Sequence, residues 1–311
     1  MTMPMDPLAP TLSSPAPGAD DSNAPGTSLW LGAWRRLRRN PAAIIGGALI
    51  LAFVLVAVFA PLIAPYPANS TRWSNEVSLT SVPGPREGNI LGLDRYGSDL
   101  FSQLIYGARQ SLIVGVVSTV LGLICGATLG IIAGGLGSWA DTIVMRIVDI
   151  MLSVPSLLLA VSIVAVLGQN RYAVMIAIAA AQIPIFARLL RGTMLSQSRS
   201  DYVLAATSLG LRRKSIVMGH VLPNSLGPTI VQATLNLSTA IIEVAALSFL
   251  GLGESDPAVA EWGRMLVAAQ DRFDSSPQLA LWPGFAIAVS ALGFTLLGEA
   301  LREALDPKGR R

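Results

Sequence analysis

Few side chains in this sequence could take part in catalysis or metal binding. The chain has a single histidine, His220, and a single cysteine, Cys125. One histidine excludes an HExxH zinc site and a two-histidine metal cage, and one cysteine can form no disulfide within the chain. The two lysines, Lys214 and Lys308, do not follow a GxxxxG phosphate-binding loop, so the sequence carries no Walker A motif. We therefore predict no catalytic residue, metal site or cofactor on this chain, and any energy must come from a partner or an ion gradient.

Glu243 is the only acidic residue well inside a long apolar stretch. Asp149 and Glu299 lie nearer the ends of such stretches, where we expect them to pair with Arg146 and Arg302. Transport driven by an ion gradient usually needs ionisable groups within the membrane to carry the coupling ion. A single carboxylate is thin support for a proton relay, so the sequence favours a subunit driven by a separate ATPase.

The most polar stretch between two long apolar runs is SDYVLAATSLGLRRKSIVMGHVLPNS, residues 200–225. Asp201 is a plausible N-cap for a short helix over 202–209, because its carboxylate can accept bonds from the first free amides. Gly210 is expected to stop that helix and to act as an elbow. Residues 212–221 predict a second short helix, which Pro223 closes. Two short helices joined by a glycine elbow form a compact projection, residues 201–223, to which a soluble partner can bind. We call this projection the knob.

Composition and charge spacing predict the elements that carry this knob. The 311 residues are 52% hydrophobic and 13% charged. Most uncharged windows exceed the roughly 20 residues that an α-helix needs to cross a bilayer, and Arg188, which ends the shortest window, can extend to the interface. We predict an all-α, polytopic membrane protein with six transmembrane helices at about 42–64, 107–134, 140–167, 172–195, 226–252 and 281–301.

The distribution of charge predicts which segments face the cytoplasm. With the N-terminus inside, the inner segments hold 15 of the 22 lysines and arginines, and the outer segments 65–105 and 253–280 carry nine acidic residues. Both termini are therefore expected in the cytoplasm. The basic clusters flank apolar stretches, which indicates contact with membrane lipid and no nucleic-acid binding. Residues 1–34, rich in Pro, Ala, Ser and Gly over most of their length, are predicted to be a disordered cytoplasmic tail and not a signal peptide.

Small residues and prolines predict how three of the helices pack or bend. Pro155 is expected to kink the third helix and Pro184 the fourth. In the second helix small residues recur every four positions, which indicates a stripe for close approach of a neighbouring helix. The members of this stripe are Ser118, Gly122, Gly126, Gly130 and Gly134.

The segment AATSLGLRRKSIVMGHVLPN resembles the EAA loop of ABC importer permeases, in which a coupling helix docks into a cleft of the ATPase subunit. The shared pattern is two alanines, a glycine four residues later and a Leu-Pro pair whose proline lies thirteen residues beyond the glycine. The matching positions are Ala205, Ala206, Gly210, Leu222 and Pro223. Leu204 stands where the family usually has glutamate, and His220 where it usually has isoleucine.

Other segments resemble the dipeptide, oligopeptide and nickel branch of that family. They are ILGLDRYGSDLFSQLIYGARQSLIVG at 90–115, LSFLGLG at 247–253, Pro257 with WGRML at 262–266, and WPGFAIAVSALGFTLLGEALREALDP at 282–307. Together the resemblance covers about 35–307. It implies the type I ABC importer permease fold and a division into a basic segment with helix 1 (35–64), an outer segment (65–105), a core of helices 2–6 with coupling loop 201–223 (106–307) and a cytoplasmic C-terminus (308–311).

The resemblance also implies partners and site residues. A second, similar permease, two ATP-binding subunits that hold ATP and Mg, and an extracytoplasmic peptide-binding protein are expected in a bacterial inner membrane. The ATPase-coupling residues are then Asp201, Ala205, Ala206, Gly210, Leu222 and Pro223. The resemblance assigns no substrate role to Glu243, which lies one residue before the acid expected in the family. From the residues alone, a carboxylate in mid-helix must face protein or water, so Glu243 is a candidate for the translocation path, either paired with another helix or recognising a peptide ammonium.

Three alternatives stay open at this point. A nickel-importing permease belongs to the same branch, but imidazole ligands suit Ni(II) and the only histidine lies in the coupling loop. A passive channel or a structural membrane subunit would lack a docking knob. A membrane enzyme needs a clustered catalytic set that the sequence does not contain.

Overall fold

The computed structural model describes residues 29–305 except 69, 79–80, 255 and 257–258. Within these residues the chain is helical, and its only β-structure is two isolated bridges, Arg86 with Asn89 and Leu93 with Asp99. Five helices are long and apolar enough to cross a membrane. They are α2 (Pro41–Val58), α4 (Leu100–Leu136), α7 (Arg171–Gln197), α10 (Leu222–Phe249) and α12 (Gln278–Leu305).

The predicted third membrane helix is not one helix. It is divided into α5 (Ser138–Leu152) and α6 (Ser156–Leu167), which meet at 90°. Pro155 has extended backbone geometry, so it breaks the helix instead of kinking it. The prediction of six spans is confirmed when this bent pair is taken as one span. Pro184, in contrast, lies inside α7, which runs on without a break.

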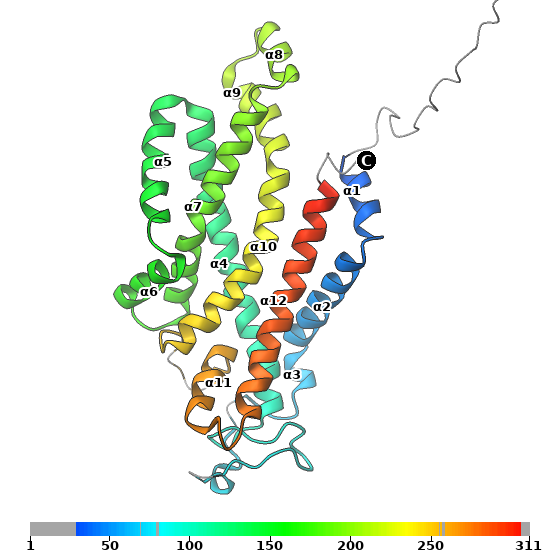
Figure 1. The fold of residues 1–311 in the computed structure, drawn as a ribbon, viewed down its shortest axis with the longest axis vertical. Coiled ribbons are helices and arrows are strands. Elements are labelled where there is room, and N and C mark those ends of the chain that lie inside the picture. Colours follow the sequence, from blue (N-terminus) through cyan, green and yellow to red (C-terminus); the bar gives the residue numbers. More distant parts are fainter. Residues whose placement is uncertain (1–28, 69, 79–80, 255, 257–258, 306–311) are drawn as a thin grey trace, which may run out of the picture.

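Shorter helices sit at the two ends of the bundle (Figure 1). At one end are α1 (Leu29–Leu37), α8 (Asp201–Ser208), α9 (Arg213–Ile216) and the end of α12. At the other end are α3 (Ala60–Ile63), α11 (Trp262–Ala269) and two single 3-10 turns, Ser74–Glu76 and Gln270–Arg272. The segments predicted to lie outside thus share one end, and the knob lies at the opposite end.

Several predicted boundaries differ from the observed ones. Residues 29–34 were expected in a disordered tail but form most of α1, whose sequence LWLGAWRRL joins apolar and basic residues in a helical pattern. The rest of the tail and the C-terminus at 308–311 lie outside the described residues. Helix α4 begins at Leu100, inside the predicted outer segment, because the Asp99 carboxylate caps it by accepting from the Ser102 amide at 2.8 Å. Helix α11 was not predicted from the residues.

The contact between α4 and α7 is built on the predicted stripe of small residues. A Cβ atom on Gly126 would lie 2.6 Å from the Ile183 carbonyl oxygen and 2.7 Å from the Phe186 Cβ. A Cβ atom on Gly122 or Gly130 would also lie close to the backbone of α7, with carbonyl oxygens at 3.0 and 2.9 Å. The two backbones therefore approach so closely that only glycine fits, which confirms the packing role of the stripe.

We expect Gly126→Ala to destabilise the bundle by about 1–3 kcal/mol, because the added methyl group must push α4 and α7 apart. The matched control is Gly47→Ala in α2, where a Cβ meets nothing within 4 Å. Thermal unfolding of both variants in detergent measures the difference. An unchanged unfolding midpoint for Gly126→Ala would contradict the tight contact described here.

Candidate functional site

The first helix of the knob begins one residue earlier than predicted. Ser200 is the N-cap of α8 and Asp201 is its first helical residue, so the predicted cap is wrong. The Ser200 hydroxyl does not cap the helix either, since it donates to the Gln197 carbonyl at 2.6 Å. Asp201 still lies in the first turn, where a carboxylate is favoured by the positive end of the helix dipole.

Gly210 forms the predicted elbow. Its φ is +76°, in the left-handed region that glycine adopts at little cost. The Gly210 amide donates to the Thr207 carbonyl at 2.9 Å and the Leu211 amide donates to the Ala206 carbonyl at 3.2 Å. These two hydrogen bonds define a Schellman motif. This pattern ends α8 and fixes the direction in which the chain leaves it.

The second half of the knob is not closed by Pro223. Helix α9, a π-helical turn at Val217–Val221 and α10 form one helical run from Arg213 to Phe249. Within the π-turn the Leu222 amide donates to the Val217 carbonyl, five residues back, and Pro223, in the first turn of α10, needs no donor there. The Asn224 side chain donates to the His220 carbonyl at 2.8 Å. The wider turn lets a proline enter a continuous helix, which explains why the predicted stop fails.

One face of the knob is anchored and the other is exposed. Ala206, Ile216 and Val221 are buried against Leu190 and Met194 of α7. The exposed face combines large apolar side chains with the three cations of the RRK run. These side chains are Leu204 (63% exposed), Leu209 (82%), Leu211 (42%) and Met218 (51%).

The six predicted coupling residues therefore divide between the two faces. Ala206 is buried in the anchoring face and Leu222 is half-buried. The others lie on the exposed side of the knob and its elbow: Asp201, Ala205, Gly210 and Pro223. The Schellman bonds join Gly210 to Thr207 and Leu211 to Ala206, so Ala206 and Gly210 belong to the same turn, while Leu222 and Pro223 lie beyond the π-turn at the start of α10.

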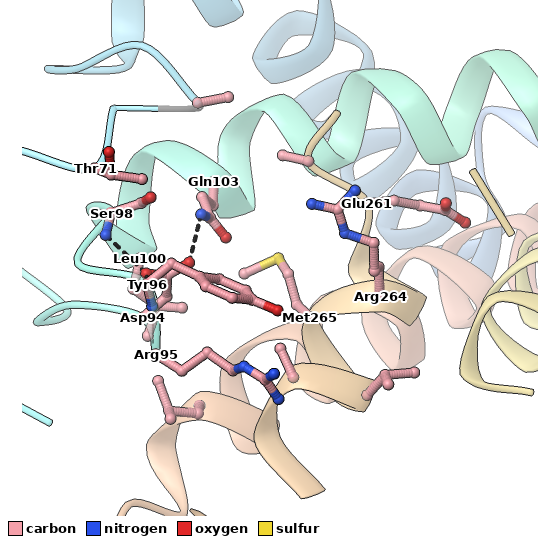
Figure 2. Close-up of a pocket in the computed structure, with 15 residues that line it drawn as sticks. Thr71, Asp94, Arg95, Tyr96, Ser98, Leu100, Gln103, Glu261, Arg264 and Met265 are labelled. Carbon is pink, nitrogen blue, oxygen red and sulfur yellow. Dashed lines mark hydrogen bonds between the residues drawn. The ribbon is translucent and has the colours of Figure 1, made fainter. Parts of the chain in front are cut away.

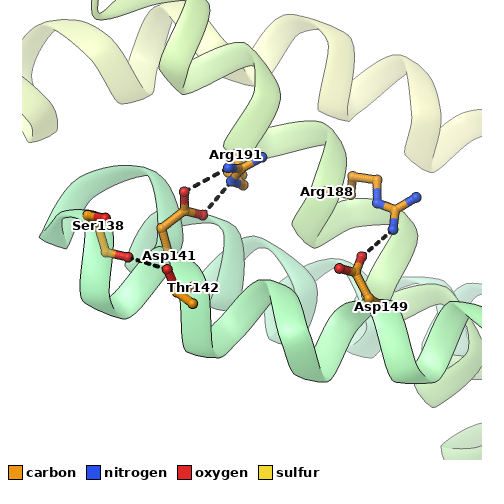
Figure 3. Close-up of polar contacts among 6 residues, drawn as sticks. All are labelled: Ser138, Asp141, Thr142, Asp149, Arg188 and Arg191. Carbon is orange, nitrogen blue, oxygen red and sulfur yellow. Dashed lines mark hydrogen bonds and ion pairs between the residues drawn. The ribbon is translucent and has the colours of Figure 1, made fainter.

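Two ion pairs join α5 to α7 below the knob (Figure 3). Arg191 binds both carboxylate oxygens of Asp141, and Arg188 binds Asp149 at 2.5 Å. Asp149 thus pairs across helices and not with Arg146, because its partner on α7 lies on the facing side. A bidentate guanidinium–carboxylate pair fixes orientation as well as distance. The Asp141–Arg191 pair was missed, since two residues 50 positions apart give no local sequence signal of their contact.

The other expected pair of charges is also absent from the described residues. No ion pair joins Glu299 to Arg302, and the neighbouring Glu303 accepts from the Asn40 side chain at 3.0 Å. This bond ties the end of α12 to the N-cap of α2, since Asn40 also accepts from the Ala42 amide. Single (i, i+3) pairs on a helix contribute only about 0.2–0.5 kcal/mol, so the absence of the Glu299–Arg302 pair costs the helix little.

Glu243 lies within the last two turns of α10, at the end opposite the knob. The helix ends at Phe249 and not at 252, so this residue is nearer the helix end than predicted. Its side chain is half-buried and hydrogen-bonds the Ser156 side chain at the start of α6, while its Oε2 atom is buried without a protein partner. The geometry favours the pairing role between helices over an exposed position on a path.

Comparison with known proteins places this geometry in a family. The family described as "Binding-protein-dependent transport system inner membrane component" matches residues 126–311, and the "N-terminal TM domain of oligopeptide transport permease C" matches residues 28–80. The first of these covers the whole knob and α5 to α12.

Individual relatives match over most of the chain. A protein of Alkalihalophilus pseudofirmus named dipeptide transport system permease protein DppC is 43% identical, covering 97% of this chain and 96% of its own. A di/tripeptide permease, DppC, of Pseudomonas aeruginosa is 42% identical over 88% of this chain and 91% of its own. A glutathione permease, GsiD, of Pectobacterium atrosepticum is 38% identical over 90% and 91%.

The fold has a solved counterpart in an inward-facing structure of the MetNI methionine ABC transporter. The TM-score is 0.55 at 18% identity, covering 67% of this chain and 98% of that one. At this identity the likeness concerns the fold alone. The family match over more than half the chain and the relatives above 40% identity establish that this protein belongs to the binding-protein-dependent transport system inner membrane components, the permeases of ABC importers.

Proposed function

We propose that this chain is the transmembrane permease subunit of an ATP-driven importer for dipeptides or oligopeptides. The observation that carries the proposal is the 43% identity with a dipeptide permease along 97% of the chain. Nickel import is not favoured, since the relatives above are named for peptides and no group of three metal-ligating side chains occurs among the described residues. Because the chain belongs to the permease family, a permease role is also favoured over a passive channel, a structural subunit and an enzyme.

The knob is suited to pass movement of an ATPase into the bundle. Its exposed leucines and its cations offer an apolar contact rimmed by positive charge. Its anchored face rests on α7, and Arg213 begins a helical run that reaches the far end of the bundle at Phe249. Movement of the knob is therefore passed to α10 through a continuous helix, while the two ion pairs link α5 to α7.

The remaining parts of the transporter follow from this role. A second, similar permease completes the path, two ATP-binding subunits hold ATP and Mg, and an extracytoplasmic binding protein delivers the peptide. The knob, α1 and the end of α12 then face the cytoplasm of a bacterial cell. The coupling role is assigned to Asp201, Ala205, Ala206, Gly210, Leu222 and Pro223.

Gly210→Val tests the coupling role of the knob. A β-branched residue at a φ of +76° is strained by roughly 1–2 kcal/mol, so we expect the backbone to leave this conformation and the knob to change direction. Steric clash does not contribute, because a Cβ at Gly210 meets no atom within 4 Å. Coupling between sites is typically about 1–3 kcal/mol, so the misdirected contact can remove most of it. We expect normal insertion but loss of substrate-stimulated ATP hydrolysis and uptake in the reconstituted complex.

The control for that test is Gly210→Asn, because asparagine tolerates the left-handed region and keeps the elbow. This variant is expected to couple ATP hydrolysis to uptake as the unmodified chain does. Wild-type coupling by Gly210→Val would remove the main support for the knob as the coupling element.

Thiol labelling of intact cells tests the orientation. With Cys125 replaced, single cysteines at Ser74 and Ser275 should react with an impermeant reagent and one at Ser215 should not, because the three exposed positions lie at opposite ends of the bundle. Permeabilised cells supply the control, in which all three positions react. Labelling of Ser215 in sealed cells would reverse the proposed topology.

Glu243→Gln separates the two roles left open for this side chain. Glutamine has the same length and can still bond the Ser156 side chain, so a pairing role predicts unchanged assembly and an unchanged KM for dipeptide uptake. Glu243→Ala removes the bond and is expected to lower thermal stability by about 1 kcal/mol. A KM raised about tenfold in Glu243→Gln alone would instead assign the carboxylate to peptide recognition.

A further inference from the structure

A cavity of about 540 Å³ opens at the end of the bundle opposite the knob. One wall is the turn before α4 together with the first residues of that helix, and the other wall is α11 (Figure 2). Pockets for small ligands usually enclose about 300–1,000 Å³ and hold a few fixed polar groups on apolar walls. This cavity has the size and the mixed lining of such a pocket.

Asp94 is the fixed anionic group of the cavity. Its Oδ1 accepts from the amides of Tyr96 at 2.9 Å and Ser98 at 2.7 Å, and its Oδ2 accepts from the Gln103 side chain at 2.7 Å. The residue is 6% exposed, and this burial raises the pKa of its carboxyl group. No salt bridge reaches Asp94 among the described residues. Each carboxylate oxygen can accept two bonds, so Oδ2 has capacity for a charged donor from a ligand.

The rest of the lining supplies positive charge and an apolar surface. The turn that Asp94 organises directs Arg95 and Tyr96 along the cavity, with the Arg95 guanidinium 4.8 Å from the centre of the Tyr96 ring. From the facing wall come the Arg264 guanidinium, which also donates to the Asp256 carbonyl, and the thioether of Met265. A guanidinium offers five N–H donors, so it can bind a carboxylate while keeping another bond.

The second acidic residue of the lining is structural. Glu261 is 3% exposed, and its carboxyl group accepts from the Ser248 hydroxyl at the end of α10. In Figure 2 its side chain turns away from Asp94. Burial raises the pKa of this group as well. The cavity therefore presents one carboxylate without an ion pair, at Asp94, and two guanidinium groups. The Arg95 guanidinium also lies 3.7 Å from the exposed Asp271 carboxylate, a distance at which a surface pair is weak.

We infer that this cavity is a binding site for the zwitterionic peptide, with the peptide ammonium at Asp94 and its carboxylate directed to Arg95 and Arg264. Tyr96, Met265 and Leu279 then supply the surface for the peptide side chains. The inference rests on the proposed function and places a receiving site within this chain alone, at the outer end, before the path between two permeases.

Binding of radiolabelled dialanine to the full chain in lipid nanodiscs, without other subunits, tests the site. Asp94→Asn is expected to weaken binding about tenfold or more, because a hydrogen bond to a charged group is lost. N-acetyl-dialanine should compete poorly for the same reason, and dialanine amide should compete poorly because it lacks the carboxylate. The matched control is Asp274→Asn, an exposed carboxylate of the other outer segment, 253–280, that does not line the cavity.

A second variant keeps the test decisive if Asp94→Asn disturbs the turn. Ala268→Phe leaves the polar groups in place and fills the cavity, so it should also abolish binding. Dialanine that binds equally to the unmodified chain, Asp94→Asn and Ala268→Phe overturns the inference, as does the absence of any binding. If these two variants lose only stimulation of the complex by its binding protein, the cavity is a docking surface and the inference fails.

The same experiment distinguishes this inference from the proposed function. If the assembled complex imports dipeptides, and the cavity variants bind and transport them normally, the proposed function holds and the proposed binding site is rejected. If the complex imports no peptide, the proposed function itself is rejected.

Discussion

The close approach of α4 and α7 is the constraint on which the rest of the structure depends. At Gly122, Gly126 and Gly130 the added Cβ would lie 2.6–3.0 Å from carbonyl oxygens of α7, so the two helices touch backbone to backbone. A bilayer supplies no hydrophobic drive between helices, and their association rests on such packing. Both ends of the molecule follow from this contact. Helix α7 leads into the knob, and the start of α4 carries Gln103 into the cavity at the far end.

The knob is rigid at its elbow and continuous with the bundle at its base. The Schellman bonds around Gly210 fix the angle of α8, and the π-turn lets the chain pass Pro223 without losing the helix. A break at Pro223 would have separated the knob from α10 by a flexible joint. Because the helix continues to Phe249, an unbroken hydrogen-bonded run connects the knob with the opposite end of the bundle.

The sequence predicts what depends on composition and local chemistry. Charge-free stretches predicted the spans, the small-residue stripe predicted the α4–α7 contact, and the glycine between two short helices predicted the elbow with positive φ. Proline was less informative, since Pro155 breaks a helix at an exposed position while Pro184 stays inside a helix where it is buried in packing. Tertiary contacts decided between these outcomes.

Partners distant in sequence were also beyond local reasoning. Asp149 was expected to bind Arg146, three residues away, but it binds Arg188 on the helix that faces it. The cavity depends on residues about 170 positions apart, such as Asp94 and Arg264. Both lie in segments that resemble the family, at 90–115 and 262–266, but nothing in the sequence indicates that the two segments share a cavity. Its position was accessible only once α11 was known to pack against the start of α4.

The far end of α10 connects the knob to that cavity. A Schellman motif at Gly251 ends this helical region as Gly210 ends α8, with the Gly251 amide donating to Ser248 and the Leu252 amide to Leu247. The Ser248 hydroxyl also holds the Glu261 carboxylate, and a Cβ on Gly263 would lie 2.6 Å from the Ala245 carbonyl oxygen.

Helix α11 is therefore fastened to α10 by a buried hydrogen bond and by backbone contact, so it moves with that helix. Asp94 belongs to the opposite wall, which is held to α4 through Gln103. Movement of α10 relative to α4 changes the separation of the two walls. If the knob passes movement of the ATPase to α10 as proposed, the same movement alters the cavity lined by Asp94 and Arg264.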